Sequence, residues 1–198
     1  MTVKQVEKTD ESLSLELPQL VMFCLTHTDD LGRIVIPKEI RRVLRIREGD
    51  PLEISTEKDG EVIFKKYSPM GELSAFAAQI CESLHKTTGA VSVICDRDTV
   101  IAVSGGNRKE LLEKRISPAL EQLMENRGMY RAGEGESVPV AEGTDTPVVS
   151  AAAPILSAGD VMGCVLFAAG EKTSAPCGET ELKLAQMVSG FLGKQMEE

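Results

Sequence analysis

Four cations are spaced so that one short helix would carry them on a single side. At about 100° per residue they fall within a narrow arc, opposite an apolar stripe. The cations are Lys38, Arg41, Arg42 and Arg45, and the stripe is Ile40, Val43 and Leu44. Guanidinium and ammonium groups gathered on one face attract phosphates, because each neutralised phosphate releases counterions. The pattern therefore predicts a surface that binds a polyanion.

The other reactive residue types form no catalytic or metal-binding pattern. The five cysteines are odd in number and include no C-x-x-C pair, so neither a zinc site nor a disulfide framework is predicted. His27 and His85 have no partner constellation for catalysis. Asp96 and Asp98 are typical of a hairpin turn, and residues 104–107 lack the glycine spacing of a phosphate-binding loop. We expect buried free thiols, no enzyme activity, no metal and no cofactor.

The residues around the cations predict the elements that position them. Residues 30–32 are typical of a tight turn, and the residues at 34–36 are β-branched, as in a strand. Pro37 suits the first helical position, where its missing N–H costs nothing. The helix is expected to end near Arg45 or Ile46. Arg33 would then stand between the turn and the strand.

Further strands complete a small N-terminal module over residues 22–67. A strand is expected at 21–28, and two more at 52–56 and 61–67, joined by the strong hairpin signal Asp59-Gly60. The order is strand, strand, helix, hairpin. A module of this size with so few aromatic residues has a thin core, so oligomerisation would help it to fold.

A second module follows a boundary at residues 68–71. Its pattern is helix, hairpin, helices, hairpin, helix, which predicts an α+β domain with an antiparallel sheet over residues 72–198. Ser117 is expected to cap a helix, and residues 128–146 to form a loop or an irregular edge. The expected helices and strands lie at 73–84, 91–95, 99–103, 147–156, 161–168 and 182–192.

The acidity of the chain lies away from the basic helix. The net charge is −9, but residues 29–67 hold nine basic and nine acidic residues, whereas residues 68–198 hold eleven and eighteen. A local basic face can therefore exist on an acidic protein. Residues 1–21 are polar and are expected to be a disordered extension. No apolar run approaches about 18 residues, so we expect no membrane segment and a cytoplasmic location.

Residues 29–42, together with 49–54 and 65–69, resemble the AbrB family of transcription factors, and most narrowly its stage V sporulation protein T branch. Residues 94–98, 101–105 and 190–196 resemble the C-terminal half of that branch. The resemblance implies a transcriptional regulator of sporulation genes that binds double-stranded DNA.

The resemblance also implies how such a protein is assembled. Two chains would interleave strands into a swapped-hairpin β-barrel, a homodimer that pairs further into a homotetramer. The C-terminal domain would be GAF-like and could take an unidentified small-molecule ligand. Arg33, Arg41 and Arg42 match the family's DNA-reading arginines, and Lys38 and Arg45 would support them at phosphates.

Two positions depart from the family's pattern, and two alternative functions remain open. Thr26 and His27 stand where the family usually carries a basic pair. The chain could therefore be a ligand-sensing or oligomerisation module with weak or lost DNA binding. An antitoxin-like interaction protein is the other alternative, because the same N-terminal fold serves in toxin neutralisation.

Overall fold

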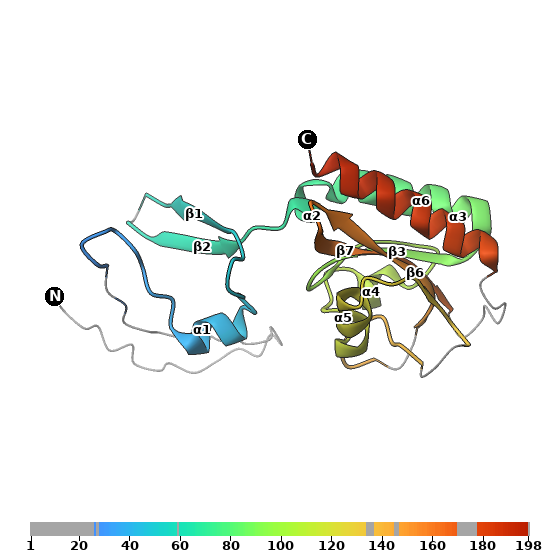
Figure 1. Ribbon diagram of the computed structural model, residues 1–198, viewed down its shortest axis with the longest axis horizontal. Coiled ribbons are helices and arrows are strands. Elements are labelled where there is room, and N and C mark those ends of the chain that lie inside the picture. The colour runs from blue at the N-terminus through green and yellow to red at the C-terminus, as the bar shows by residue number, and fades with distance from the viewer. Residues whose placement is uncertain are drawn as a thin grey trace, which may run out of the picture. The chain divides into compact units, whose positions relative to one another are not determined.

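The computed structural model describes residues 26, 28–58, 60–133, 137–144, 147–169 and 178–197. The chain divides into two compact units, residues 1–50 and 51–198, and each is described by itself (Figure 1). The predicted extension at 1–21, most of the predicted strand at 21–28 and His27 lie outside the described residues.

The first unit consists of a tight turn and one short helix. Thr28 and Ile34 form an isolated antiparallel bridge across the turn, and α1 spans Lys38–Val43. Residues 34–36 therefore do not form the predicted strand, because only Ile34 has a β partner among the described residues. None of the described residues of this unit is buried. The unit has no core of its own among these residues.

The second unit begins with the predicted hairpin. Strands β1 (Leu52–Thr56) and β2 (Val62–Lys66) pair antiparallel, with Leu52 opposite Lys66 and Thr56 opposite Val62. Gly60 adopts φ of +81° in the connection, a conformation that glycine reaches without steric cost. Asp59, the other half of the turn signal, lies outside the described residues.

A five-stranded antiparallel sheet forms the centre of the second unit, in the order β4-β3-β7-β6-β5. Its strands are β3 (Val91–Asp96), β4 (Val100–Ser104), β5 (Tyr130–Arg131), β6 (Val148–Ser157) and β7 (Asp160–Ala169). The helices are α2 (Pro69–Glu72), α3 (Ser74–Thr88), α4 (Arg108–Leu111), α5 (Pro118–Glu125) and α6 (Glu179–Gln195). The predicted α+β class and the predicted order of helices and hairpins are confirmed.

Alternating strand residues build a separate core on each face of the sheet. Ile94 and Phe167 pack with residues of α3 and α6, which lie side by side over one face (Figure 1). Val93 and Leu166 point the other way, into a core shared with α4 and α5. Ser117 caps α5 as predicted, since its Oγ accepts a hydrogen bond of 3.0 Å from the Leu120 N–H.

Candidate nucleic-acid interface

Arg33 is held in place by a carboxylate from the preceding turn. The Nε–H of Arg33 donates to Oδ2 of Asp29 over 2.6 Å. Oδ1 of Asp29 accepts the backbone N–H groups of Leu31, at 3.0 Å, and Arg33, at 2.8 Å. Both carboxylate oxygens are therefore used within four residues of chain.

The backbone closes the same turn. The N–H of Gly32 donates to the carbonyl of Asp29 over 2.9 Å, and Gly32 has φ of +74°. The backbone and side-chain hydrogen bonds from Arg33 hold the pKa of Asp29 below its usual value. These hydrogen bonds favour the ionised carboxylate, which is the form that pairs with the guanidinium.

Helix α1 presents three of the predicted cations to solvent. Lys38, Arg41 and Arg42 are exposed, and their side chains form no ion pair with any residue that the structure describes. Like charges on one exposed helix face repel one another. Such a face is well suited to an anion that neutralises it.

Arg45 lies outside the helix, so the prediction that all four cations share one helix face is wrong. The helix ends at Val43, and Arg45 takes the left-handed conformation with φ of +49°. The N–H of Ile46 donates to the carbonyl of Arg41 over 2.8 Å, and that of Arg45 to Arg42 over 3.4 Å. This is the Schellman closure, in which glycine is the usual left-handed residue. An arginine at that position offers no sequence signal for the end of the helix.

Pro37 also differs from its predicted place. It precedes the helix as N-cap, with an extended ψ of 147°, and its carbonyl accepts the N–H of Arg41. The helix is thus shorter at both ends than its sequence pattern, and it spans six residues.

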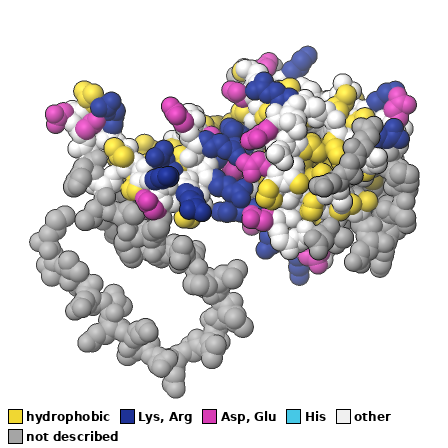
Figure 2. Space-filling view, turned by 60° about the horizontal axis from the view of Figure 1, so that its bottom comes forward, with side chains coloured by type: hydrophobic (Ala, Val, Ile, Leu, Met, Phe, Trp, Pro, Cys, Tyr) yellow, Lys and Arg dark blue, Asp and Glu magenta, His cyan; other side chains and the backbone are white. Residues whose placement is uncertain are grey.

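Apolar side chains of the first unit are exposed beside these cations. Leu31 is 76% and Val35 71% exposed, and Ile34, Val43 and Leu44 are also at the surface. Figure 2 shows hydrophobic side chains and Lys and Arg side chains together on the surface of the described residues. Exposed large apolar residues at this density are typical of an interface with another chain.

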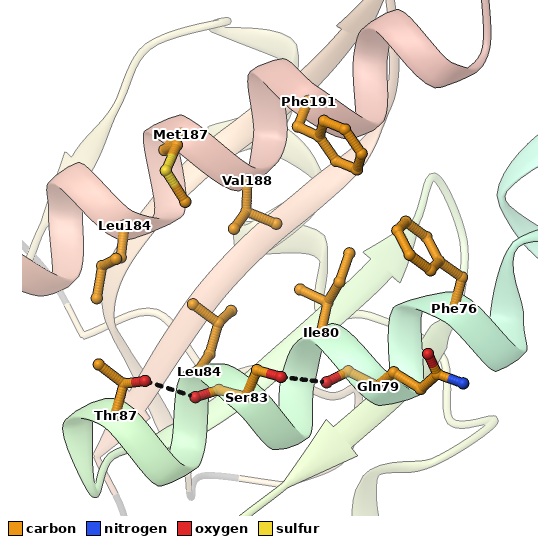
Figure 3. A pocket seen from close by; sticks show the side chains of 10 residues that line it. All are labelled: Phe76, Gln79, Ile80, Ser83, Leu84, Thr87, Leu184, Met187, Val188 and Phe191. Carbon is orange, nitrogen blue, oxygen red and sulfur yellow. Dashed lines mark hydrogen bonds between the residues drawn. The ribbon is translucent and has the colours of Figure 1, made fainter.

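A second apolar surface lies in a groove of about 420 Å³ between α3 and α6 (Figure 3). Phe76 and Phe191 face each other across it, with ring centroids 6.0 Å apart. The hydroxyls of Ser83 and Thr87, on its rim, donate to carbonyls of their own helix. The lining is therefore apolar and offers few unused polar groups. The groove was not predicted from the sequence.

The part of the chain that the structure describes shows neither a membrane-spanning helix nor a metal site. No helix there is long and apolar enough to cross a membrane, and no group of metal-ligating side chains is found there. The described cysteines, Cys81, Cys95 and Cys164, are free and buried, as expected.

Two family models match this chain in adjacent segments. Residues 72–197 match the model of the C-terminal domain of stage V sporulation protein T, described as a transcription factor. Residues 28–71 match the model of the bacterial antitoxin MazE, described as antidote-toxin recognition.

Two curated relatives come from Bacillus subtilis. Stage V sporulation protein T is 47% identical over 171 residues, which cover 86% of this chain and 94% of the relative. The transition state regulatory protein AbrB is 56% identical over 98 residues, which cover 48% of this chain and 83% of the relative.

Solved GAF domains align at much lower identity. The GAF domain of a phosphoenolpyruvate-protein phosphotransferase from Coxiella burnetii is 15% identical, with a TM-score of 0.49, over 63% of this chain and 82% of that one. The cofactor-binding GAF domain of the nutrient sensor CodY from Clostridium difficile is 12% identical, with a TM-score of 0.44, over 60% and 83%.

Proposed function

Because the chain belongs to the stage V sporulation protein T family, we propose that it is a transcription factor that binds double-stranded DNA and regulates genes during spore formation. Arg33, Arg41 and Arg42 are its main DNA contacts, and Lys38 and Arg45 add phosphate contacts. The protein works on DNA in the cytoplasm.

The exposed cationic face of α1 carries this proposal. Lys38, Arg41 and Arg42 point into solvent without an ion-pair partner among the described residues. Of the acidic residues near this face, Asp29 is already bound to Arg33. A duplex phosphate backbone supplies the missing negative charge, and each phosphate that is neutralised adds to the salt dependence of binding.

A salt titration of DNA binding tests the proposal directly. Wild type should bind duplex DNA with an affinity that falls steeply with salt. Arg41→Ala and Arg42→Ala should each weaken binding and reduce the slope of log K against log salt by about 1 for every phosphate that the variant no longer neutralises. Lys183→Ala is the matched control, because it removes an exposed cation from α6, where Lys183 pairs with Glu179.

Two outcomes would count against the proposal. Wild type that binds no duplex DNA even at low salt would favour the signalling module without DNA binding. Slopes that are equal for Arg41→Ala and Lys183→Ala would mean that net charge, and not the α1 face, determines binding.

The first unit and the hairpin that follows it complete their fold in a homodimer. The described residues of the first unit include no buried side chain, and Val35 and Leu31 stand exposed. Exchange of the β1–β2 hairpin between two chains would cover such residues and double the number of cations facing DNA. In that arrangement the DNA-binding domain spans residues 22–67 and the linker residues 68–71.

The C-terminal domain, residues 72–198, brings two dimers together. The apolar groove between α3 and α6 supports this assembly, since Met187 is 63% and Phe191 47% exposed beside it. Helix faces of this kind pack against other helices. The domain also senses a small molecule, as the family resemblance implies.

Toxin neutralisation is the second candidate function, because residues 28–71 match the MazE antitoxin model. Antitoxins of this kind are expected to wrap their toxin with a disordered C-terminal tail. Here α3 to α6 surround a sheet with two buried cores. This folded domain stands where a toxin-wrapping tail would be expected, and it favours the first function over this one.

A further inference from the structure

We propose that Asp29 is a positioning residue, which orients the Arg33 guanidinium and thereby raises the preference of the protein for specific over non-specific DNA. This inference rests on the proposed function. It concerns a carboxylate at a surface that should bind a polyanion, where a negative charge by itself would weaken binding.

The hydrogen bonds determine which donors of Arg33 remain for DNA. Nε–H is occupied by Asp29 Oδ2 at 2.6 Å. The terminal Nη1 and Nη2 groups bond no residue that the structure describes, and the Arg33 side chain is 72% exposed. Through these terminal groups, arginine donates two hydrogen bonds at once to a guanine edge or to a phosphate.

The backbone of the turn also holds the carboxylate. Oδ1 of Asp29 accepts the N–H groups of Leu31 and Arg33, so the side chain cannot rotate without breaking these hydrogen bonds. Because Arg33 is hydrogen-bonded to this fixed carboxylate, its side chain has already lost much of its rotamer freedom in the DNA-free protein. Binding therefore costs less entropy when DNA presents acceptors in the matching geometry.

The charge of Asp29 acts in the opposite direction on non-specific DNA. Non-specific binding depends on phosphate neutralisation, which a nearby carboxylate reduces. An aspartate is ionised at neutral pH, so Asp29 places a negative charge at this surface. Asp29 should therefore weaken non-specific binding while strengthening specific binding, a combination that a purely structural residue would not produce.

The variant Asp29→Asn separates these effects. Its amide oxygen can still accept the N–H groups of Leu31 and Arg33, whereas its NH₂ group cannot accept from Arg33 Nε. Asp30→Asn is the matched control, because it removes the same charge from the same turn and Asp30 makes no hydrogen bond or ion pair among the described residues.

The experiment measures full-length protein on two probes, a duplex selected by wild type from a random-sequence pool and a shuffled duplex. We expect Asp29→Asn to bind the shuffled duplex more tightly and the selected duplex more weakly, which lowers the specificity ratio about tenfold (~1.4 kcal/mol). Asp30→Asn should tighten both alike. In an Arg33→Ala background, Asp29→Asn should no longer weaken binding to the selected duplex.

Three results would overturn the inference. One is a specificity ratio that falls equally in Asp29→Asn and Asp30→Asn, and another is an effect of Asp29→Asn on the selected duplex that persists with Arg33→Ala. The third is an Arg33 Nε–H NMR signal with the same exchange rate in wild type and Asp29→Asn, measured without DNA. Because the NMR signal needs no DNA, it distinguishes failure of this inference from failure of the proposed function.

Discussion

Lys66 and Asp98 form an ion pair that joins the end of the β1–β2 hairpin to the turn between β3 and β4. Nζ of Lys66 lies 2.5 Å from Oδ2 of Asp98, and each side chain is only about one fifth exposed, 21% and 20%. Ser68 strengthens the junction, since its hydroxyl donates to Oδ2 of Asp96 over 3.0 Å. The segment that follows the hairpin is therefore bound to the β3–β4 turn.

Lys66→Met should destabilise the protein by about 1–2 kcal/mol, because Asp98 then keeps its charge in a mostly buried position without its cation. Chemical unfolding measures the loss, and Lys65→Met, an exposed neighbour on β2, should change stability by less than about 0.5 kcal/mol. The double variant Lys66→Met/Asp98→Asn should recover part of the loss. Additive single losses would show that the pair is not coupled.

Two glycines of α6 should respond to alanine in opposite directions. A Cβ on Gly193 would lie 2.1 Å from the backbone carbonyl oxygen of Leu156, whereas a Cβ on Gly190 would meet nothing within 4 Å. Gly193→Ala should therefore cost about 1–3 kcal/mol or more, because α6 must move away from β6. Gly190→Ala should stabilise by about 0.5–1 kcal/mol through helix propensity. Thermal unfolding of both variants measures the sign of each change in stability. A Gly193→Ala variant as stable as wild type would contradict the close packing.

Val35→Asp should dissociate the proposed homodimer. The side chain is 71% exposed in the single chain, so a charge there costs little unless another chain covers it. Light scattering after size-exclusion chromatography measures the mass, and DNA affinity should fall with it. Asn107→Asp adds the same charge at an exposed position before α4 and serves as the control. A Val35→Asp protein with unchanged mass would rule out this residue as part of the interface.

Met187→Asp should reduce a tetramer to dimers without unfolding the chain. Met187 is 63% exposed beside the α3–α6 groove, so the substitution disturbs little packing within the chain but places a charge in the proposed interface. Analytical ultracentrifugation follows the mass, with Gln186→Asp, an exposed neighbour on α6, as the control. Equal masses for wild type and both variants would place the dimer–dimer interface elsewhere.

The buried thiols should resist modification in the folded protein. Burial raises the pKa of Cys81 to about 12, and the adjoining Cys164 thiol together with burial raises that of Cys95. Because thiolate is the reactive form, a raised pKa keeps these groups inert near neutral pH, and reactivity should increase only as pH approaches the raised value. In a Cys24→Ser/Cys177→Ser variant, a thiol reagent should react with the three remaining cysteines only after denaturation. Rapid reaction of the folded variant would contradict this burial.

Local signals predicted most of the elements of the C-terminal domain. The apolar runs at 91–95 and 161–168 correspond to strands whose two faces build two different cores. Ser117 caps its helix where its side chain can accept an N–H. These features depend on residues close in sequence, so the local pattern of residue types is enough to predict them.

Elements near the candidate site were less well predicted. The strand at 34–36 does not form in the single chain, because a strand needs a hydrogen-bonding partner that the described residues do not supply beyond Ile34. The end of α1 was also missed, since it depends on Arg45 adopting a left-handed conformation that its side chain does not signal.

By itself, the sequence determined the α+β class, the order of its elements and the basic residues 33, 38, 41, 42 and 45, since these follow from residue type and local periodicity. Tertiary structure decided which groups meet. It committed Nε of Arg33 to Asp29, paired Lys66 with Asp98 across 32 residues, and opened an apolar groove between α3 and α6. The physical reason is that a hydrogen bond or a packed groove depends on distances in space, which periodicity along the chain does not encode.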